Sequence, residues 1–189
     1  METKNTLFSS ALKSGLIIGA VSIVTFLIMY VFDIKPIGIL IPILLLLVSI
    51  AISIIILVIL LKKYRVSSGG FISFRNAFLF AFLAFAVSVI LYQGFNYIFL
   101  QLVDPEYNKT IMEAQKTWME GYLSGKMSDE QIAEQLDKLD EQAAKMGSFS
   151  TLIKNTFGSI IVFGIVALIV GAIMKKNPEM FDTTDGGAI

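Results

Sequence analysis

Four stretches without a charged side chain dominate this chain, at residues 14–32, 37–61, 76–103 and 155–174. Each is about as long as the roughly 20 residues that a helix needs to cross the hydrocarbon core of a bilayer, or longer. The chain as a whole is 56% hydrophobic over 189 residues, which is above the usual fraction for a soluble domain. We therefore predict an all-α polytopic membrane protein, in which four transmembrane helices form a single membrane domain over residues 1–189.

The distribution of basic residues predicts the orientation of this domain. The segment between the second and third spans is basic and contains no acid, and the residues after the fourth span are basic as well. These residues are Lys62, Lys63, Arg65, Arg75, Lys175 and Lys176. The loop of residues 104–154 instead holds ten acidic residues against six lysines. Loops rich in Lys and Arg stay in the cytoplasm, so we expect both termini to be cytoplasmic and this loop to be extracytoplasmic.

The long loop of residues 104–154 carries the signals of two helices. Asp104 and Pro105 predict the start of the first, with the aspartate as its cap and the proline at its first position. Ser128 and Gln131 have the spacing of a capping box at the start of the second. The loop should therefore form an extracytoplasmic hairpin of two helices.

Each helix of this hairpin should carry one apolar stripe. The stripes consist of Tyr107, Ile111, Ala114, Trp118 and Tyr122, and of Ile132, Leu136, Leu139, Ala143 and Met146. Amphipathic helices joined by a short turn pack stripe against stripe, so we expect an antiparallel pair with Trp118 as its buried anchor. The hairpin should extend directly from the third and fourth spans. Its candidate docking residues are Trp118, Ile132, Leu136 and Leu139.

Two amides, Gln93 and Asn96, lie well inside the third span. Polar groups in hydrocarbon are costly, so both should face the interior of the bundle. One interpretation is a contact with a substrate or an ion in a pore, and the other is an interhelical hydrogen bond to Ser22 or Thr25 of the first span. No carboxylate or basic side chain lies inside any span, which argues against a proton-coupled transporter or pump.

Small residues recur at four-residue or similar spacing in the first and fourth spans. The candidate packing positions are Gly15, Gly19, Gly164 and Gly171. Such faces let two helix backbones approach closely. They indicate either a homodimer interface or, as ordinary bundles use them, packing between helices of the same chain.

Several chemistries are excluded by residue type. The chain has no cysteine and no histidine, so it has no disulfide, no thiolate or imidazole metal ligand, no cysteine nucleophile and no histidine base. It also shows no catalytic constellation and no phosphate-binding or dinucleotide motif. The basic cluster near residue 63 is too small to indicate nucleic acid and is explained by lipid headgroups. We expect no enzyme activity, no cofactor, no metal site and no nucleic-acid partner.

Two segments of the chain resemble a known bacterial family. They are Gly-Gly-Phe-Ile-Ser-Phe-Arg-Asn-Ala-Phe at residues 69–78 and Asp-Pro-Glu-Tyr at residues 104–107. The chain is similar, from the first span through the fourth, to the family catalogued as domain of unknown function 4199, small inner-membrane proteins found chiefly in the Bacteroidota. The resemblance implies four spans, a helical loop and a bacterial inner membrane. It implies no activity and no catalytic positions.

Two functions from different classes follow from these observations. The first is a structural or interaction component of the inner membrane, whose hairpin docks onto a membrane protein partner. The alternative is a small dimeric channel or transporter in which Gln93 and Asn96 are polar contacts. A continuous polar cavity that reaches Gln93 would favour transport, whereas a solid apolar bundle would favour the structural role.

Overall fold

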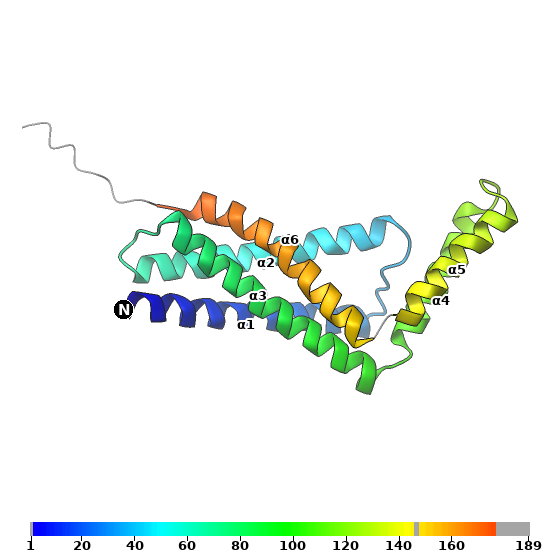
Figure 1. Ribbon diagram of the computed structural model, residues 1–189, viewed down its shortest axis with the longest axis horizontal. Helices are drawn as coiled ribbons and strands as arrows, with labels where there is room; N and C mark the ends of the chain where they lie inside the picture. The colour runs from blue at the N-terminus through cyan, green and yellow to red at the C-terminus, as the bar shows by residue number, and fades with distance from the viewer. Residues whose placement is uncertain (1, 146–147, 177–189) are drawn as a thin grey trace, which may run out of the picture.

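The chain folds into four long apolar helices and a helical hairpin (Figure 1). The computed structural model describes residues 2–145 and 148–176. The long helices are α1 (Glu2–Val31), α2 (Leu40–Ser67), α3 (Phe74–Ile98) and α6 (Phe149–Met174). All four are long and apolar enough to cross a membrane, so the predicted all-α fold with four spans is confirmed.

The helices reach further than the uncharged stretches of the sequence. α3 continues directly into the π-helix η1 (Phe99–Val103), so the third apolar stretch is helical to its end. α1 and α6 include Lys13 and Lys154 near the ends of their spans. Long basic side chains can reach the headgroup region from such positions, so a helix need not stop where its first charge appears.

α3 is the central helix of the bundle and packs against α1 and α6, whereas α2 has far fewer contacts with its neighbours. The close approaches depend on glycine. A Cβ atom on Gly15 would lie 2.6 Å from the carbonyl oxygen of Ala84, and one on Gly171 would lie 3.0 Å from the Cα atom of Phe78. α1 and α6 can therefore lie this close to α3 only because these positions carry no side chain.

The two ends of the bundle are packed differently. We call the end where residues 68–73 join α2 to α3 the terminal end, and the end where residues 32–39 join α1 to α2 the hairpin end. The half of the bundle near the terminal end holds the solid apolar core. Its largest fully buried side chains are Ile18, Leu57, Leu61, Phe80 and Phe85.

Backbone hydrogen bonds close the terminal end. Ile72, in the α2–α3 loop, exchanges two hydrogen bonds with Lys176, which follows α6, at N–O distances of 3.0 and 2.9 Å. The guanidinium of Arg65 also donates to the carbonyl oxygen of Met174 at 3.3 Å. These contacts tie the last turns of α2 and α6 to the start of α3.

The hairpin consists of α4 (Tyr107–Leu123) and α5 (Asp129–Lys145). The predicted capping box is confirmed, because the Ser128 amide donates to Gln131 Oε1 at 3.1 Å and the Gln131 amide donates to Ser128 Oγ at 3.4 Å. An ion pair between Lys116 and Asp140 joins the two helices. Met146, the last residue of the predicted α5 stripe, lies outside the described residues.

The predicted stripe-to-stripe packing of the hairpin is wrong for α4. Two of its stripe residues, Tyr107 and Trp118, face the bundle instead, and the Tyr107 ring contacts the rings of Phe26 and Phe99. The ring of Trp118 lies against Gly38 in the α1–α2 loop, 3.1 Å from where a Cβ atom would stand. The hairpin therefore does not extend from α3 and α6 but turns across the end of the bundle (Figure 1). The aromatic face of α4 therefore packs against the apolar ends of the spans rather than against α5.

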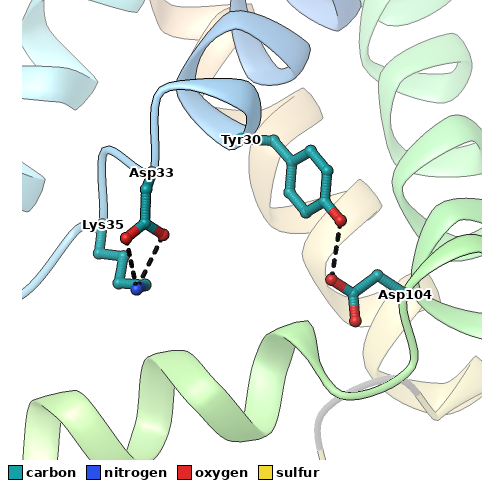
Figure 2. A network of polar contacts seen from close by, with 4 residues as sticks. All are labelled: Tyr30, Asp33, Lys35 and Asp104. Atoms are coloured by element: carbon teal, nitrogen blue, oxygen red, sulfur yellow. Dashed lines mark hydrogen bonds and ion pairs between the residues drawn. The ribbon is translucent and has the colours of Figure 1, made fainter.

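The predicted cap of the first hairpin helix is also wrong. The residue at the N-cap of α4 is Glu106, and its side chain makes no capping hydrogen bond. The carboxylate of Asp104 instead accepts a hydrogen bond from the hydroxyl of Tyr30 at 2.9 Å (Figure 2). The aspartate is thus used to join the end of α1 to the end of η1.

Candidate binding cavity

A cavity of about 310 Å³ lies between α1, α2, α3 and α6, in the half of the bundle toward the hairpin end. Every one of these helices contributes polar side chains to it. They are Ser22 and Thr25 of α1, Ser49 and Ser53 of α2, Ser88, Tyr92 and Gln93 of α3, and Ser159 of α6. No ionisable carboxylate or basic side chain lines it, so the cavity is uncharged and rich in hydroxyl groups.

Most of these hydroxyl groups already donate a hydrogen bond to the protein backbone. Ser22, Thr25, Ser49 and Ser53 each donate to the carbonyl oxygen four residues earlier, at 2.8 to 3.0 Å. Ser88 donates to the Phe85 carbonyl at 2.8 Å. A hydroxyl oxygen that donates once can still accept. The wall of the cavity therefore presents mainly hydrogen-bond acceptors to whatever enters.

The side chain of Gln93, the one amide in this lining, makes no hydrogen bond in the described part of the chain, and the same holds for the hydroxyls of Tyr92 and Ser159. The predicted bond between Gln93 and Ser22 or Thr25 is not formed: both hydroxyls donate within their own helix, and neither accepts from the Gln93 amide. Among the described residues, no fully buried polar side-chain atom lacks a partner. The amide of Gln93 is therefore not sealed in the core but faces open space, with donor and acceptor both available.

Gln93 also lines a second hollow, of about 220 Å³, nearer to the hairpin. This hollow lies between α3, the start of α4 and the start of α6. Its polar lining includes Asn96, Asn108, Ser148, Thr151 and Asn155. Of the two amides singled out in the sequence, both Gln93 and Asn96 line this outer hollow, whereas Gln93 alone also lines the inner cavity. Gln93 therefore lies between the outer hollow and the inner cavity.

The inner cavity ends at the apolar core. One helical turn beyond Ser22, Ser53 and Val89, toward the terminal end, the chain places Ile18, Leu57 and Phe85, and each of these is at most 1% exposed. The polar lining therefore reaches from the hairpin end to the middle of the bundle and stops there.

α2 forms the loosest wall of this cavity. Its buried residues, Ser53, Leu57 and Leu61, lie from the middle of the helix toward the terminal end. At the other end, the amide of Gly38 in the preceding loop donates to Oε1 of Gln115 in α4 at 2.8 Å. Gly38 has a φ of +82°, a conformation that favours glycine. The hairpin thus holds the loop that leads into α2.

Aromatic rings close the hairpin end on the side of α1. Tyr30 contacts the rings of Phe99 and Tyr107 at centroid distances of 4.9 and 5.4 Å. Burial raises the pKa of the Tyr107 phenol above its ordinary value, and the negative charge of Asp33 raises it further. Asp33 itself is paired with Lys35 (Figure 2). The cluster holds α1, η1 and α4 together.

The candidate packing glycines lie against α3 of the same chain. A Cβ atom on Gly19 would stand 2.8 Å from Leu91 Cδ2, and one on Gly164 would stand 3.6 Å from the Phe82 ring. Together with Gly15 and Gly171, they are used between helices of one chain, so they do not form a free dimer face.

The candidate docking residues occupy less buried positions than predicted. Trp118 is half-buried and stacks on Tyr122 at a centroid distance of 5.0 Å. Ile132, Leu136 and Leu139 are half-buried on α5. In the described residues, no group of three or more acidic side chains is arranged to hold a metal ion.

Comparison with known families gives one match. The family described as protein of unknown function (DUF4199) matches residues 13–176, which covers most of the first span, the other three spans and the hairpin. The chain belongs to this family. No curated protein and no solved structure matches this DUF4199 protein.

Apart from Ser22 and Thr25, the hydroxyl residues of the cavity were not singled out from the sequence of this DUF4199 protein. A signal exists, because Ser49 and Ser53 stand four residues apart in the otherwise aliphatic second span. Serine in such a helix commonly bonds to its own backbone, so its presence alone does not indicate a site. Only the meeting of hydroxyls from four helices around Gln93 does so.

Proposed function

We propose that this membrane protein is a binding protein rather than an enzyme, and that it takes up a small, uncharged, hydrogen-bonding molecule from its hairpin side. The observation that carries the proposal is the free amide of Gln93 in a hydroxyl-lined cavity within the spans. A polar group at membrane depth without a partner is costly, and such groups are retained where they contact a ligand or water. An uncharged ligand is favoured because the lining has no ionisable carboxylate or basic side chain.

The polar lining supports one-sided binding rather than a continuous channel. Ile18, Leu57 and Phe85 block the way toward the terminal end. Transport would require α2 to move away from these side chains, and α2 is the least tightly packed of the four spans. The transporter alternative thus fits the cavity, whereas an open pore through a single chain does not.

A chemical test is simple because the chain has no cysteine. In nanodiscs, a Gln93→Cys variant should react with N-ethylmaleimide, a small uncharged probe, at a rate that saturates as the probe concentration rises. Saturation arises because the probe binds in the cavity before it reacts. Mass spectrometry measures the extent of modification over time.

Two control variants provide an exposed and a buried reference for this reaction rate. Ser124→Cys, on the exposed hairpin turn, should react in proportion to probe concentration without saturation. Ala81→Cys, at a fully buried core position, should react at least tenfold more slowly than Gln93→Cys. A linear rate at Gln93→Cys, or a rate as slow as that of Ala81→Cys, would contradict the proposal.

For the membrane, we propose the bacterial inner membrane with both termini in the cytoplasm. The basic residues at the terminal end and the acidic hairpin support this orientation. In intact cells freed of the outer membrane, a membrane-impermeant maleimide should label Ser128→Cys. It should label Lys63→Cys only after the membrane is permeabilised. The reverse pattern would place the hairpin in the cytoplasm.

Docking of the hairpin onto a membrane protein partner stays a prediction, as does a homodimer. The hairpin is held to the bundle through α4, which leaves α5 as its outer helix without any buried residue. This arrangement leaves α5 accessible, but it does not specify a partner.

A further inference from the structure

A separate hollow of about 1060 Å³ lies at the terminal end of the bundle, between the start of α1, the end of α2 and the start of α3. None of its lining residues lines the cavity around Gln93. One part of the lining is polar and comes from the helix ends, namely Ser67, Ser68, Arg75 and Asn76. Another part is apolar and includes Leu7, Leu79 and Leu83.

Arg75 supplies the charge of this hollow. Its side chain is exposed, and among the described residues it forms no ion pair and no hydrogen bond. The chain has no acidic residue between positions 36 and 103, so α2, α3 and the loop between them offer it no carboxylate. Lys62 and Lys63 add positive charge at the same end. A guanidinium in this setting is suited to bind a phosphate from outside the protein.

The apolar part of the hollow continues from Arg75 into the membrane. Leu79 and Leu83 follow Arg75 at four-residue steps on α3, so the three side chains share one face of the helix. At 1.5 Å per residue, this face runs roughly 12 Å from the arginine toward the middle of the bilayer. Phe71 and Phe74, which are 44% and 43% exposed, flank the polar end at the level where the helix begins.

We propose that this hollow is a binding site for an anionic phospholipid. The headgroup phosphate contacts Arg75 and the hydroxyl and amide groups beside it, and one acyl chain follows Leu79 and Leu83. The order of the lining, polar at the end of the span and apolar toward its middle, matches the order of groups in a lipid. A free phosphate would use the arginine but not the apolar wall. The excess of positive charge selects an anionic headgroup over a zwitterionic one.

The test compares phosphatidylglycerol with phosphatidylcholine. The full chain in dodecyl maltoside micelles receives both lipids at equal amounts, and native mass spectrometry counts the lipids that remain bound. We expect phosphatidylglycerol to be retained at least fivefold more than phosphatidylcholine. Arg75→Gln should bring this ratio close to one. Circular dichroism checks that the variant stays helical, which its exposed position favours.

Control variants separate this site from a diffuse basic surface. Lys63→Gln removes a neighbouring charge outside the hollow and should leave the ratio within twofold of the unaltered protein. Leu83→Asn should lower phosphatidylglycerol retention although it changes no charge. The proposal is overturned if the two lipids are retained equally, or if Lys63→Gln acts as strongly as Arg75→Gln. Displacement of the lipid by millimolar inorganic phosphate, with no effect of Leu83→Asn, would indicate a free-phosphate site instead.

Discussion

Replacing Phe80 by alanine should lower the free energy of unfolding by about 2–3 kcal/mol, the cost of an unfilled cavity the size of the lost ring. Phe80 is fully buried in the core and lies 5.0 Å from the ring of Tyr64, centroid to centroid. In a bilayer, the unfolded helix keeps the ring in hydrocarbon. The transfer energy that adds to such changes in soluble proteins is therefore small, and the lost packing dominates. Unfolding by SDS in mixed micelles, followed by circular dichroism, measures the change.

Phe157→Ala is the matched control for this change. Phe157 lies on α6 and is 64% exposed, so its ring faces lipid rather than the core. Its removal should cost less than about 0.5 kcal/mol, as for surface positions in general. Equal effects of the two variants would show that the half of the bundle near the terminal end is not packed as described.

Replacing Gly15 by alanine should destabilise the protein by about 1–3 kcal/mol, although only one methyl group is added. That methyl would stand 2.6 Å from the carbonyl oxygen of Ala84 and 2.7 Å from Cβ of Val87. The first of these atoms belongs to the backbone, so it cannot move aside by a change of rotamer. α1 would have to shift away from α3, which loosens the closest contact in the bundle. The same SDS titration measures the loss.

Gly158→Ala is expected to change the stability in the opposite direction. Gly158 lies on α6 with no atom within 4 Å of the position of its missing Cβ atom. Alanine there should stabilise the helix by roughly 0.5–1 kcal/mol, because glycine loses more backbone entropy. A Gly15→Ala variant as stable as Gly158→Ala would mean that α1 and α3 are not in contact at this point.

The spans and the start of α5 could be predicted from the sequence because both depend on local patterns. A stretch without charges as long as residues 37–61 has few alternatives to a membrane helix. The capping box of Ser128 and Gln131 involves residues three positions apart, so it forms wherever the helix starts. Neither depends on how the helices are arranged.

The arrangement of the spans could not be predicted in the same way. Apolar side chains that face lipid and those that face another helix look alike in a sequence, so the central position of α3 leaves no clear pattern. The cavity exists because α2 contacts its neighbours so little, which is a property of the packed bundle. Its polar residues come from four helices, and only Gln93 is unusual enough to be noticed alone.

In the hairpin, the apolar stripe of α4 was predicted correctly, but the surface against which it packs was not. The stripe of Tyr107 and Trp118 is real, and the sequence shows that it must be covered. Two surfaces were available, α5 and the ends of the spans, and periodicity does not choose between them. Asp104 was misassigned for a similar reason, because the distant Tyr30 hydroxyl binds the carboxylate that was expected to cap α4.

The bond between Gly38 and Gln115 links the two parts of the molecule mechanically. α2 is anchored in the core at one end by Leu57 and Leu61, and at the other it is tethered through Gly38 to the hairpin. α2 can therefore pivot about the end that is fixed in the core, while α4 holds its other end. A load on the hairpin that tilted α4 would pull on the loop before α2 and would thereby change the width of the space around Gln93. By thermodynamic reciprocity, a molecule that wedges α2 outward must also change the pose of the hairpin.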